Sequence, residues 1–362
     1  MFKILYGKDK KDGYKVWSIA VEGNKITISH GKMDGKQTTK EELIYGKNLG
    51  RANETSNEQQ AVLEAESRYK KQLDKGYRPT LDALEDLPIL PMLAKDFHKE
   101  GHRVVWPCYG SRKLDGLRCL AIRHSDRVEL RSRGGKEYNV QHIQDELMSI
   151  MKGGDMLDGE LYIPGKELEE ISSAVKRASN PDHAVLQYWV FDAPEVGCPF
   201  KNRLTTVESI PERVPLKNVH IVPHEVVKDE DHMRKLHKQY VSEGYEGIML
   251  NNMFGEYLSG PSRSEDIQKY KEMIDEEFKV VGVEKDRNDN AILICFDGTA
   301  NAHFNVTFGD FAKRKHQLEH PEEYAGKWLT VAYQKRYKDS RLPQFPAGKA
   351  IRECAEDGTP LE

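Results

Sequence analysis

Cysteine is scarce in this chain of 362 residues, and none of it stands in a metal-binding spacing. The five cysteines are odd in number, lie far apart in the sequence, and include no Cys-x-x-Cys pair. This pattern predicts neither a disulfide framework nor a zinc site, and it suits a reducing compartment. We therefore expect a cytoplasmic protein.

Long hydrophobic runs are absent as well. No stretch approaches the ~20 apolar residues that a membrane-spanning helix requires. Residues 1–20 contain several lysines but lack the continuous apolar segment of a signal peptide. Because 31% of the residues are charged, we expect a soluble protein with no membrane partner, and the length predicts two or three domains.

Positive charge is in short supply except near the start of the chain. Residues 1–80 contain 16 Lys and Arg against 11 Asp and Glu, a balance of +5, whereas the remainder contains 39 against 48, a balance of −9. A small basic domain on an acidic chain often contacts a polyanion such as a nucleic acid. A solvated lysine-rich surface explains the charge equally well.

The basic segment 1–80 is predicted to form a small α+β unit. Alternating apolar residues predict strands over 15–21 and 25–28, and residues 30–36 form a glycine-punctuated loop with basic side chains. A helix is predicted over 57–75, with a capping box at its start and a glycine after its end.

The chain's most distinctive chemical motif is Lys113-Leu114-Asp115-Gly116-Leu117-Arg118. Its apolar flanks predict a strand, a turn that carries Lys113, and a second strand. A lysine becomes a nucleophile when burial or a nearby cation lowers its pKa, and an amine in such a pocket can attack phosphorus to form a phosphoramidate. A single motif of this kind is equally compatible with an exposed hairpin turn.

Two later stretches place charged side chains beside predicted turns. The segment 131–136 sets basic residues around paired glycines, which suits either a phosphate-binding turn or a plain hairpin. A strand over 156–162 carries Asp158, Glu160 and Tyr162 on one face. Paired carboxylates there suit either a Mg²⁺ site or an acidic edge strand.

Three further strands are predicted in the middle of the chain. The nearly continuous apolar run 184–193 predicts a buried strand in which Phe191 belongs to the core. A strand over 245–251 carries the carboxylate of Glu246 near its start. Lys269 and Lys271 fall on one face of a third strand, because side-chain direction repeats every two residues. Their repulsion would be relieved by an anion between them.

The pattern changes after residue 278, where only short elements are predicted. The expected strands and a short helix are, in order, 278–285, 291–297, 303–308, the helix 310–318, and 327–335. A series of short strands in a segment of this size suggests a small barrel of the OB type.

In their order along the chain, these stretches resemble the motif series of the covalent nucleotidyltransferases. The resemblance is closest to ATP-dependent DNA ligases of the small viral or bacteriophage type, and it spans about 90–357. Each motif is weak alone, but the complete series in family order is specific. The matching motifs are Lys113 to Arg118, Ser132 to Gly135, Asp158 to Glu160, Phe191-Asp192, Glu246-Gly247 with Met249, Lys269 with Lys271, and Arg341 to Pro343 with Arg352.

The resemblance implies a monomeric enzyme that uses ATP and Mg²⁺ (or Mn²⁺) on nicked double-stranded DNA. Lys113 would attack the α-phosphate of ATP, and the AMP would pass to the 5′-phosphate at the nick. The 3′-hydroxyl would then displace AMP, so that every step is a phosphoryl transfer.

Roles for individual residues follow from the same resemblance. The implied catalytic residues are Lys113, Lys269 and Lys271, whose positive field would lower the pKa of Lys113. The implied metal ligands are Glu160 and Glu246. The implied nucleotide contacts are Arg112, Arg118, Arg133, Glu160, Phe191, Met249, Lys269, Lys271 and Arg352. Arg118 and Arg133 would also grip the phosphate at the nick.

Residues 1–80 resemble the WGR domain of nuclear poly(ADP-ribose) polymerases. The likeness rests on His30-Gly31-Lys32 before Asp34-Gly35, with His and Lys in place of the family's Trp and Arg. Because that family contacts DNA ends or nicks, the likeness implies DNA contacts by basic residues. The candidates are Lys32, Lys36, Lys47 and Arg51.

The expected fold class is therefore multidomain α+β. A WGR-like domain over 1–80 and a Pro-containing linker over 78–90 come first. Next comes an adenylation (nucleotidyltransferase) domain over 85–276, which we expect to be ATP-grasp-like with antiparallel sheets and flanking helices. An OB-fold domain over 277–362 follows it.

Two features complicate the resemblance. Many family members carry Glu two residues before the lysine, where this chain has Ser111, so we expect the adenine amino group to meet a backbone carbonyl or a water. Strand alternation also places Glu246 and Met249 on opposite faces. Contact of Met249 with adenine would then need a local twist.

Three alternatives share parts of the motif series. An ATP-dependent RNA ligase or an mRNA-capping guanylyltransferase has the same lysine and carboxylates, and the Arg-Leu-Pro ending and the WGR-like start argue against the capping enzyme. An NAD-dependent ligase is disfavoured because no four-cysteine module is present. An inactive nick-binding protein is disfavoured because every expected catalytic position is kept. The compact size suggests a virus, which would place the enzyme in the host cytosol.

Overall fold

The computed structural model describes residues 1–9, 13–84, 89–260, 263–286, 290–356 and 358–361. The chain divides into two compact units, Met1–Tyr270 and Lys271–Glu362. The finer division into three domains stays a prediction. Pro88, in the predicted linker, and the predicted domain start at residue 85 lie outside the described residues. In the described part of the chain, no helix is both long and apolar enough to cross a membrane.

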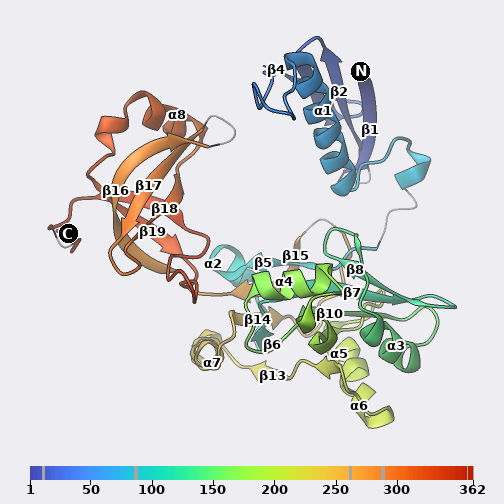
Figure 1. Ribbon diagram of the computed structural model, residues 1–362. Helices are drawn as coiled ribbons and strands as arrows, with labels where there is room; N and C mark the ends of the chain where they lie inside the picture. Colours follow the sequence, from blue (N-terminus) through green and yellow to red (C-terminus); the bar gives the residue numbers. More distant parts are fainter. Residues whose placement is uncertain (10–12, 85–88, 261–262, 287–289, 357, 362) are drawn as a thin grey trace. The chain divides into compact units, whose positions relative to one another are not determined.

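The first unit begins with a four-stranded antiparallel sheet against which one helix packs (Figure 1). Trp17, Ile19 and Val21 point to one buried face of β2, as their alternation predicts, and pack with Ala61 and Ala65 of α1. The predicted capping box begins α1. These elements are β1 Phe2–Lys8, β2 Tyr14–Glu22, β3 Lys25–Lys32, β4 Gln37–Leu43 and α1 Asn57–Asp74.

The predicted loop over residues 30–36 is wrong in its first half. β3 continues to Lys32 and pairs with β4, so only residues 33–36 form the turn. Gly31 does not interrupt the strand. The strand needs a glycine there because a Cβ would lie 2.6 Å from the carbonyl oxygen of Lys36.

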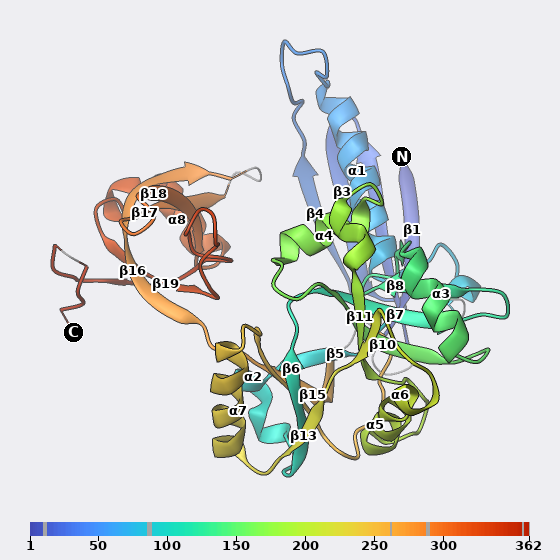
Figure 2. The ribbon, with the colours of Figure 1, turned by 60° about the horizontal axis from the view of Figure 1, so that its bottom comes forward.

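Two sheets form the rest of the first unit (Figure 2). The six-stranded sheet has the order β12-β11-β10-β7-β8-β9, and the five-stranded sheet has the order β13-β6-β14-β15-β5. β6 and β7 are consecutive in the chain but belong to different sheets. The segment 114–116 between them therefore crosses from one sheet to the other, directly after Lys113.

Helices cover both sheets. α3, α4 and α5 contact strands of the six-stranded sheet, and α2 and α7 contact strands of the five-stranded sheet. The bounds of the strands are β5 Leu93–Asp96, β6 Cys108–Lys113, β7 Leu117–Arg123, β8 Val128–Ser132, β9 Glu137–Tyr138, β10 Met156–Tyr162, β11 Gln187–Asp192, β12 Val219–Ile221, β13 His224–Val227, β14 Gly247–Asn251 and β15 Arg263–Tyr270. The bounds of the helices are α2 Phe97–Glu100, α3 Gln141–Ile150, α4 Leu168–Lys176, α5 Phe200–Glu208, α6 Ile210–Arg213 and α7 Glu230–Ser242.

The second unit is a closed barrel with the strand order β16-β17-β18-β20-β19. Pairing of β16 with β19 closes the ring, and Phe278, Leu293 and Val306 lie in its buried core. The sequence did not locate β20, whose residues show no strict alternation of burial. The elements are β16 Ile274–Lys285, β17 Ala291–Asp297, β18 Ala302–Phe308, α8 Phe311–Glu319, β19 Trp328–Tyr333 and β20 Ala347–Arg352.

Candidate active site

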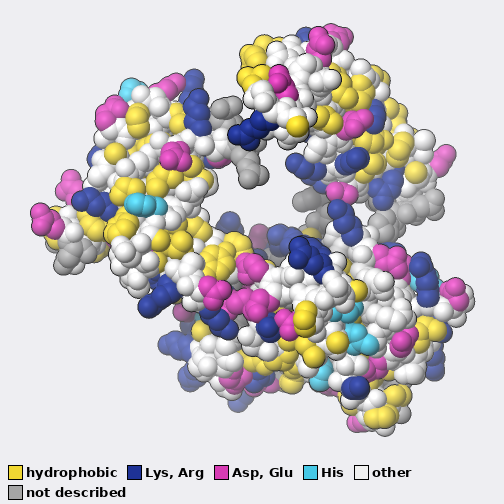
Figure 3. All heavy atoms as spheres, in the orientation of Figure 1, with side chains coloured by type: hydrophobic (Ala, Val, Ile, Leu, Met, Phe, Trp, Pro, Cys, Tyr) yellow, Lys and Arg dark blue, Asp and Glu magenta, His cyan; other side chains and the backbone are white. Residues whose placement is uncertain are grey.

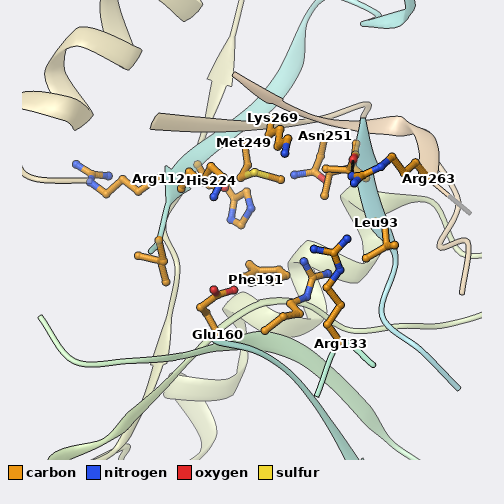
Figure 4. A pocket seen from close by; sticks show the side chains of 16 residues that line it. Leu93, Arg112, Arg133, Glu160, Phe191, His224, Met249, Asn251, Arg263 and Lys269 are labelled. Carbon is orange, nitrogen blue, oxygen red and sulfur yellow. Dashed lines mark hydrogen bonds between the residues drawn. The ribbon is translucent and has the colours of Figure 1, made fainter. Parts of the chain in front are cut away.

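A pocket lies in the first unit, with side chains from both of its central sheets (Figure 4). Four strands of the five-stranded sheet contribute one row of cross-strand neighbours to this pocket: His224, Ser111, Met249 and Lys269. The six-stranded sheet contributes Arg118, Glu160 and Phe191 from neighbouring strands. Residues far apart in the sequence are thus placed around one cavity by strand pairing.

Lys113 is the last residue of β6 and lines this pocket. Its ammonium donates a hydrogen bond to Oε2 of Glu246. The backbone N–H of Glu246 donates to the carbonyl of Lys113 at 3.0 Å, which fixes the two residues side by side. Because 19% of the Lys113 side chain remains exposed, against 7% for Glu246, the amine can still reach a ligand.

Glu160, on β10, contacts the turn that follows Lys113. Its Oε1 accepts a hydrogen bond from the backbone N–H of Gly116 at 3.2 Å. A side chain at Gly116 would not fit, since a Cβ would lie 2.4 Å from the carbonyl oxygen of Leu161. Burial raises the pKa of Glu160 to about 7, although the charges of Arg118 and Lys113 oppose this.

Arg118 is held by a buried carboxylate. Its guanidinium donates two hydrogen bonds of 2.6 Å to Asp158, whose side chain is fully buried, and Tyr257 donates a third to the same carboxylate. Burial alone would lower the pKa of Arg118, but Asp158 outweighs it and the pKa stands above its usual value. The guanidinium lies 4.6 Å from the ring centre of Phe191, so Arg118 is a fixed wall of the pocket.

Glu160 and Glu246 are the carboxylates available for a metal ion. Among the residues that the structure describes, no group of three or more His, Cys, Asp and Glu side chains is placed to hold an ion. Burial is the main cause of the raised pKa of Glu160, and the negative charge of Glu246 adds to it. Mg²⁺ commonly binds one or two carboxylates and takes its other oxygens from water and phosphate. The pair fits an ion that arrives with a phosphate ligand.

The premise that Glu246 and Met249 belong to one regular strand is wrong, and contact of Met249 with adenine stays a prediction. β14 begins at Gly247, so strand alternation does not extend to Glu246. Met249 lines the pocket, and Glu246 contacts the Lys113 amine beside it.

Two other predicted site residues, Arg133 and Arg112, lie in the first unit, and their guanidinium groups have different surroundings. Arg133 lines the pocket and points into it (Figure 4). Arg112 borders the pocket, but its guanidinium pairs with Glu243 at 2.8 Å and lies over the ring of Tyr240. The charge of Arg112 is therefore directed to α7.

Lys271 and Arg352 belong to the second unit. The prediction that Lys269 and Lys271 share one face of a strand is wrong, because β15 ends at Tyr270. Lys271 instead donates to the side chain of Gln334 at 2.7 Å. Arg352 lies at the end of β20, 4.0 Å from Glu277.

The sequence did not identify several residues of the pocket. His224, Asn251 and Arg263 line the pocket but had no motif to mark them, and their positions depend on strand pairing that a sequence does not display. Tyr257, which does not line the pocket but donates to Asp158, had no motif either. The only available sign was the absence of the expected Glu at Ser111, which pointed to a substitute elsewhere.

The four basic candidates near the start of the chain do not form one cluster. Lys32 and Lys36 flank the turn between β3 and β4, whereas Lys47 and Arg51 follow the opposite end of β4, roughly 20 Å away by strand length. Lys47 also pairs with Glu64 of α1 at 2.9 Å. Both signs of charge are interspersed on the visible face of this part (Figure 3).

The pocket brings together the amine of Lys113, the carboxylates of Glu160 and Glu246, and the guanidinium of Arg118. The aromatic ring of Phe191 and the thioether of Met249 also line it. Such a constellation suits a nucleotide whose base is held by apolar groups and whose phosphates face the amine. The fold and pocket thus define the class of nucleotidyl-transferring enzymes.

Comparison with known proteins narrows this class. The family model described as "ATP dependent DNA ligase domain" matches residues 91–271, which is half of the chain. The DNA ligase of African swine fever virus (isolate Pig/Kenya/KEN-50/1950) is 28% identical over an alignment that covers 96% of this chain and 86% of the relative. The DNA ligase of enterobacteria phage T4 is 25% identical over 55% of this chain and 51% of its own.

Solved structures show the same fold. A Lig E DNA ligase superposes with a TM-score of 0.61 at 23% identity and covers 73% of this chain and 99% of its own. A structure of Pmar-Lig gives a TM-score of 0.65 at 20% identity, over 81% of this chain and 71% of its own.

The chain belongs to the ATP-dependent DNA ligase family and is an enzyme of that family. The mixed, sheet-rich α+β multidomain fold agrees with this membership.

Proposed function

We propose that this DNA ligase seals nicks in duplex DNA through an AMP adduct on Lys113. The observation that carries the proposal is the position of the Lys113 amine, which lines a pocket walled by Arg118, Glu160 and Phe191. The adenine of ATP would stack on Phe191 and contact Met249. The α-phosphate of ATP would then face the Lys113 amine, and Lys269 and Arg133 would lie near the phosphates.

The chain's own residues would carry out the proton transfer. Lys113 must lose a proton before its lone pair can attack phosphorus, and Oε2 of Glu246 is the hydrogen-bond acceptor already in contact with that amine. Lysine attack on the α-phosphate forms the N–P bond and breaks the bond to pyrophosphate. Glu160 and Glu246 would hold Mg²⁺ (or Mn²⁺), which would neutralise phosphate charge.

The parts outside this pocket have supporting roles in the proposal. The barrel of the second unit is an OB domain, and the first 80 residues are a WGR-like domain that adds affinity for nicked DNA. Lys271 and Arg352 would bind phosphate during the first step. The enzyme would act as a monomer in the cytoplasm, or in the host cytosol if its source is a virus, in DNA replication, repair and recombination.

A nick-sealing assay tests this function. A duplex with one labelled 5′-phosphate nick is incubated with the protein, ATP and Mg²⁺, and we expect a longer labelled strand on a denaturing gel. A matched duplex with a 5′-hydroxyl at the nick should not be joined. Transfer of GMP to RNA ends instead would favour a capping guanylyltransferase, and joining of RNA alone would favour an RNA ligase.

A further inference from the structure

His224 has a defined tautomer within the pocket. It begins β13, and its ring points into the pocket beside Met249 (Figure 4). Nδ1 lies 2.9 Å from the carbonyl oxygen of Val222. A carbonyl can only accept, so Nδ1 carries the proton and Nε2 of the neutral ring is an acceptor. Burial lowers the pKa of His224 to about 4, which keeps the ring neutral near pH 7.

The Nε2 atom of His224 is buried and has no hydrogen-bond partner among the described residues. A buried acceptor without a partner destabilises a protein, and a ligand that supplies a donor removes this cost. The atom is screened from solvent by its neighbours, so a ligand must displace one of them to reach it. Met249, unbranched and flexible, lies beside it and is suited to move.

His224 lies beside Ser111, the position at which this chain lacks the glutamate that the resemblance led us to expect. The two residues are cross-strand partners on β13 and β6. Ser111 has a short side chain, which leaves room for the imidazole that reaches over from the neighbouring strand. The ring of Phe200, 5.5 Å from the imidazole centre, helps to fix its orientation.

We propose that Nε2 of His224 accepts a hydrogen bond from the 6-amino group of adenine and thereby selects ATP over GTP. Guanine carries a carbonyl oxygen at that position, which would face Nε2 as a second acceptor and leave both atoms without a proton between them. This inference rests on the nucleotide-binding function proposed above. It replaces the backbone carbonyl or water that the sequence led us to expect as the partner of the amino group.

The test measures covalent labelling of the full chain with ATP, GTP and purine riboside triphosphate, which has hydrogen in place of the amino group. For the wild-type protein we expect kcat/KM for ATP to exceed that for purine riboside triphosphate by roughly 10- to 100-fold, the range expected for one buried hydrogen bond. His224→Phe should reduce this ratio to near one, with the loss in KM rather than kcat. His224→Gln should use GTP better than the wild type, because its amide can turn to donate.

His220→Phe is the matched control. His220 is a half-buried histidine whose Nε2 atom is likewise buried without a partner among the described residues, but its ring stacks on Trp189 with ring centres 5.0 Å apart and does not line the pocket. This variant should keep the wild-type preference for ATP.

Two results would overturn the inference: equal use of ATP and purine riboside triphosphate by the wild-type protein, or an undiminished preference in His224→Phe. If His224→Phe does not fold, the wild-type comparison still decides. Absence of labelling with every nucleotide would instead contradict the proposed function itself.

Discussion

At the scale of single residues, the pocket depends on charged side chains that strand pairing brings together. Lys113, Glu160 and Arg118 were identified from the sequence because they stand in short motifs, and the structure brings them to one pocket. The contacts that define their state, from Asp158, Tyr257 and Glu246, arise from strand pairing and could not be inferred from spacing. His224 was missed for the same reason.

The first prediction concerns Glu160, whose replacement should change thermal stability and enzymatic activity in opposite directions. Its folded pKa of about 7 lies above the ordinary value of 4.5, so the folded protein binds this proton more tightly than the unfolded chain. The contribution of Glu160 to stability is therefore complete below pH 4.5 and is lost as the pH rises through 7. Glu160→Gln should gain thermal stability relative to the wild type over that interval, while its rate of AMP transfer falls by about 10²–10³-fold.

Melting temperatures of both proteins, measured from about pH 5 to about pH 8, check the stability effect. Parallel curves would show that burial does not raise the pKa of Glu160. A wild-type rate of AMP transfer in the variant would remove Glu160 from the site.

At the scale of elements, the sequence predicted strands and helices well where the apolar period was clear. α1 with its capping box and β10 lie within a residue or two of their predicted bounds. The start of β11 was set too early, because residues 181–185 form a 3₁₀ turn that apolar composition does not distinguish from a strand. The division of consecutive β6 and β7 between two sheets was not predictable from a local pattern.

The turn between β6 and β7 gives the second prediction. Gly116→Ala should lower both thermal stability and AMP transfer, because a Cβ would lie 2.4 Å from the carbonyl oxygen of Leu161 and 2.8 Å from Cγ of Glu160. Overpacking of this kind costs about 1–3 kcal/mol. Gly153→Ala is the control, since a Cβ there would have no atom within 4 Å. Equal melting temperatures and rates for the two variants would contradict the close approach.

At the scale of the whole molecule, the two units give predictions about separate steps. Arg133 lines the pocket of the first unit, whereas Arg352 belongs to the second. We expect Arg352→Ala to slow self-adenylation but to spare sealing of nicks that are already adenylated, because its predicted role is confined to the first step. Arg133→Ala should show the opposite bias. Single-turnover rates of both steps, measured for both variants, provide the test, and equal losses would argue against separate roles.

The basic start of the chain gives the fourth prediction. Deleting residues 1–80 should leave self-adenylation unchanged, raise KM for nicked DNA, and flatten the slope of log K against log salt by roughly 0.9 for each lost phosphate contact. Because Lys32 with Lys36 and Lys47 with Arg51 lie at opposite ends of β4, charge-removing variants of the two pairs should act independently. Binding titrations at several salt concentrations decide, and superimposed lines for the full and shortened chains would show that this part does not contact DNA.

The most direct test of the account is the attachment of AMP to Lys113. The full chain is incubated with Mg²⁺ and ATP labelled at the α-phosphate, boiled, and run on a denaturing gel. We expect label on the wild-type protein and none on Lys113→Arg, because a guanidinium stays protonated and cannot attack phosphorus. Lys113→Arg should still seal a pre-adenylated nick in part, since that step needs no lysine nucleophile. Label on Lys113→Arg at the wild-type level would contradict the account.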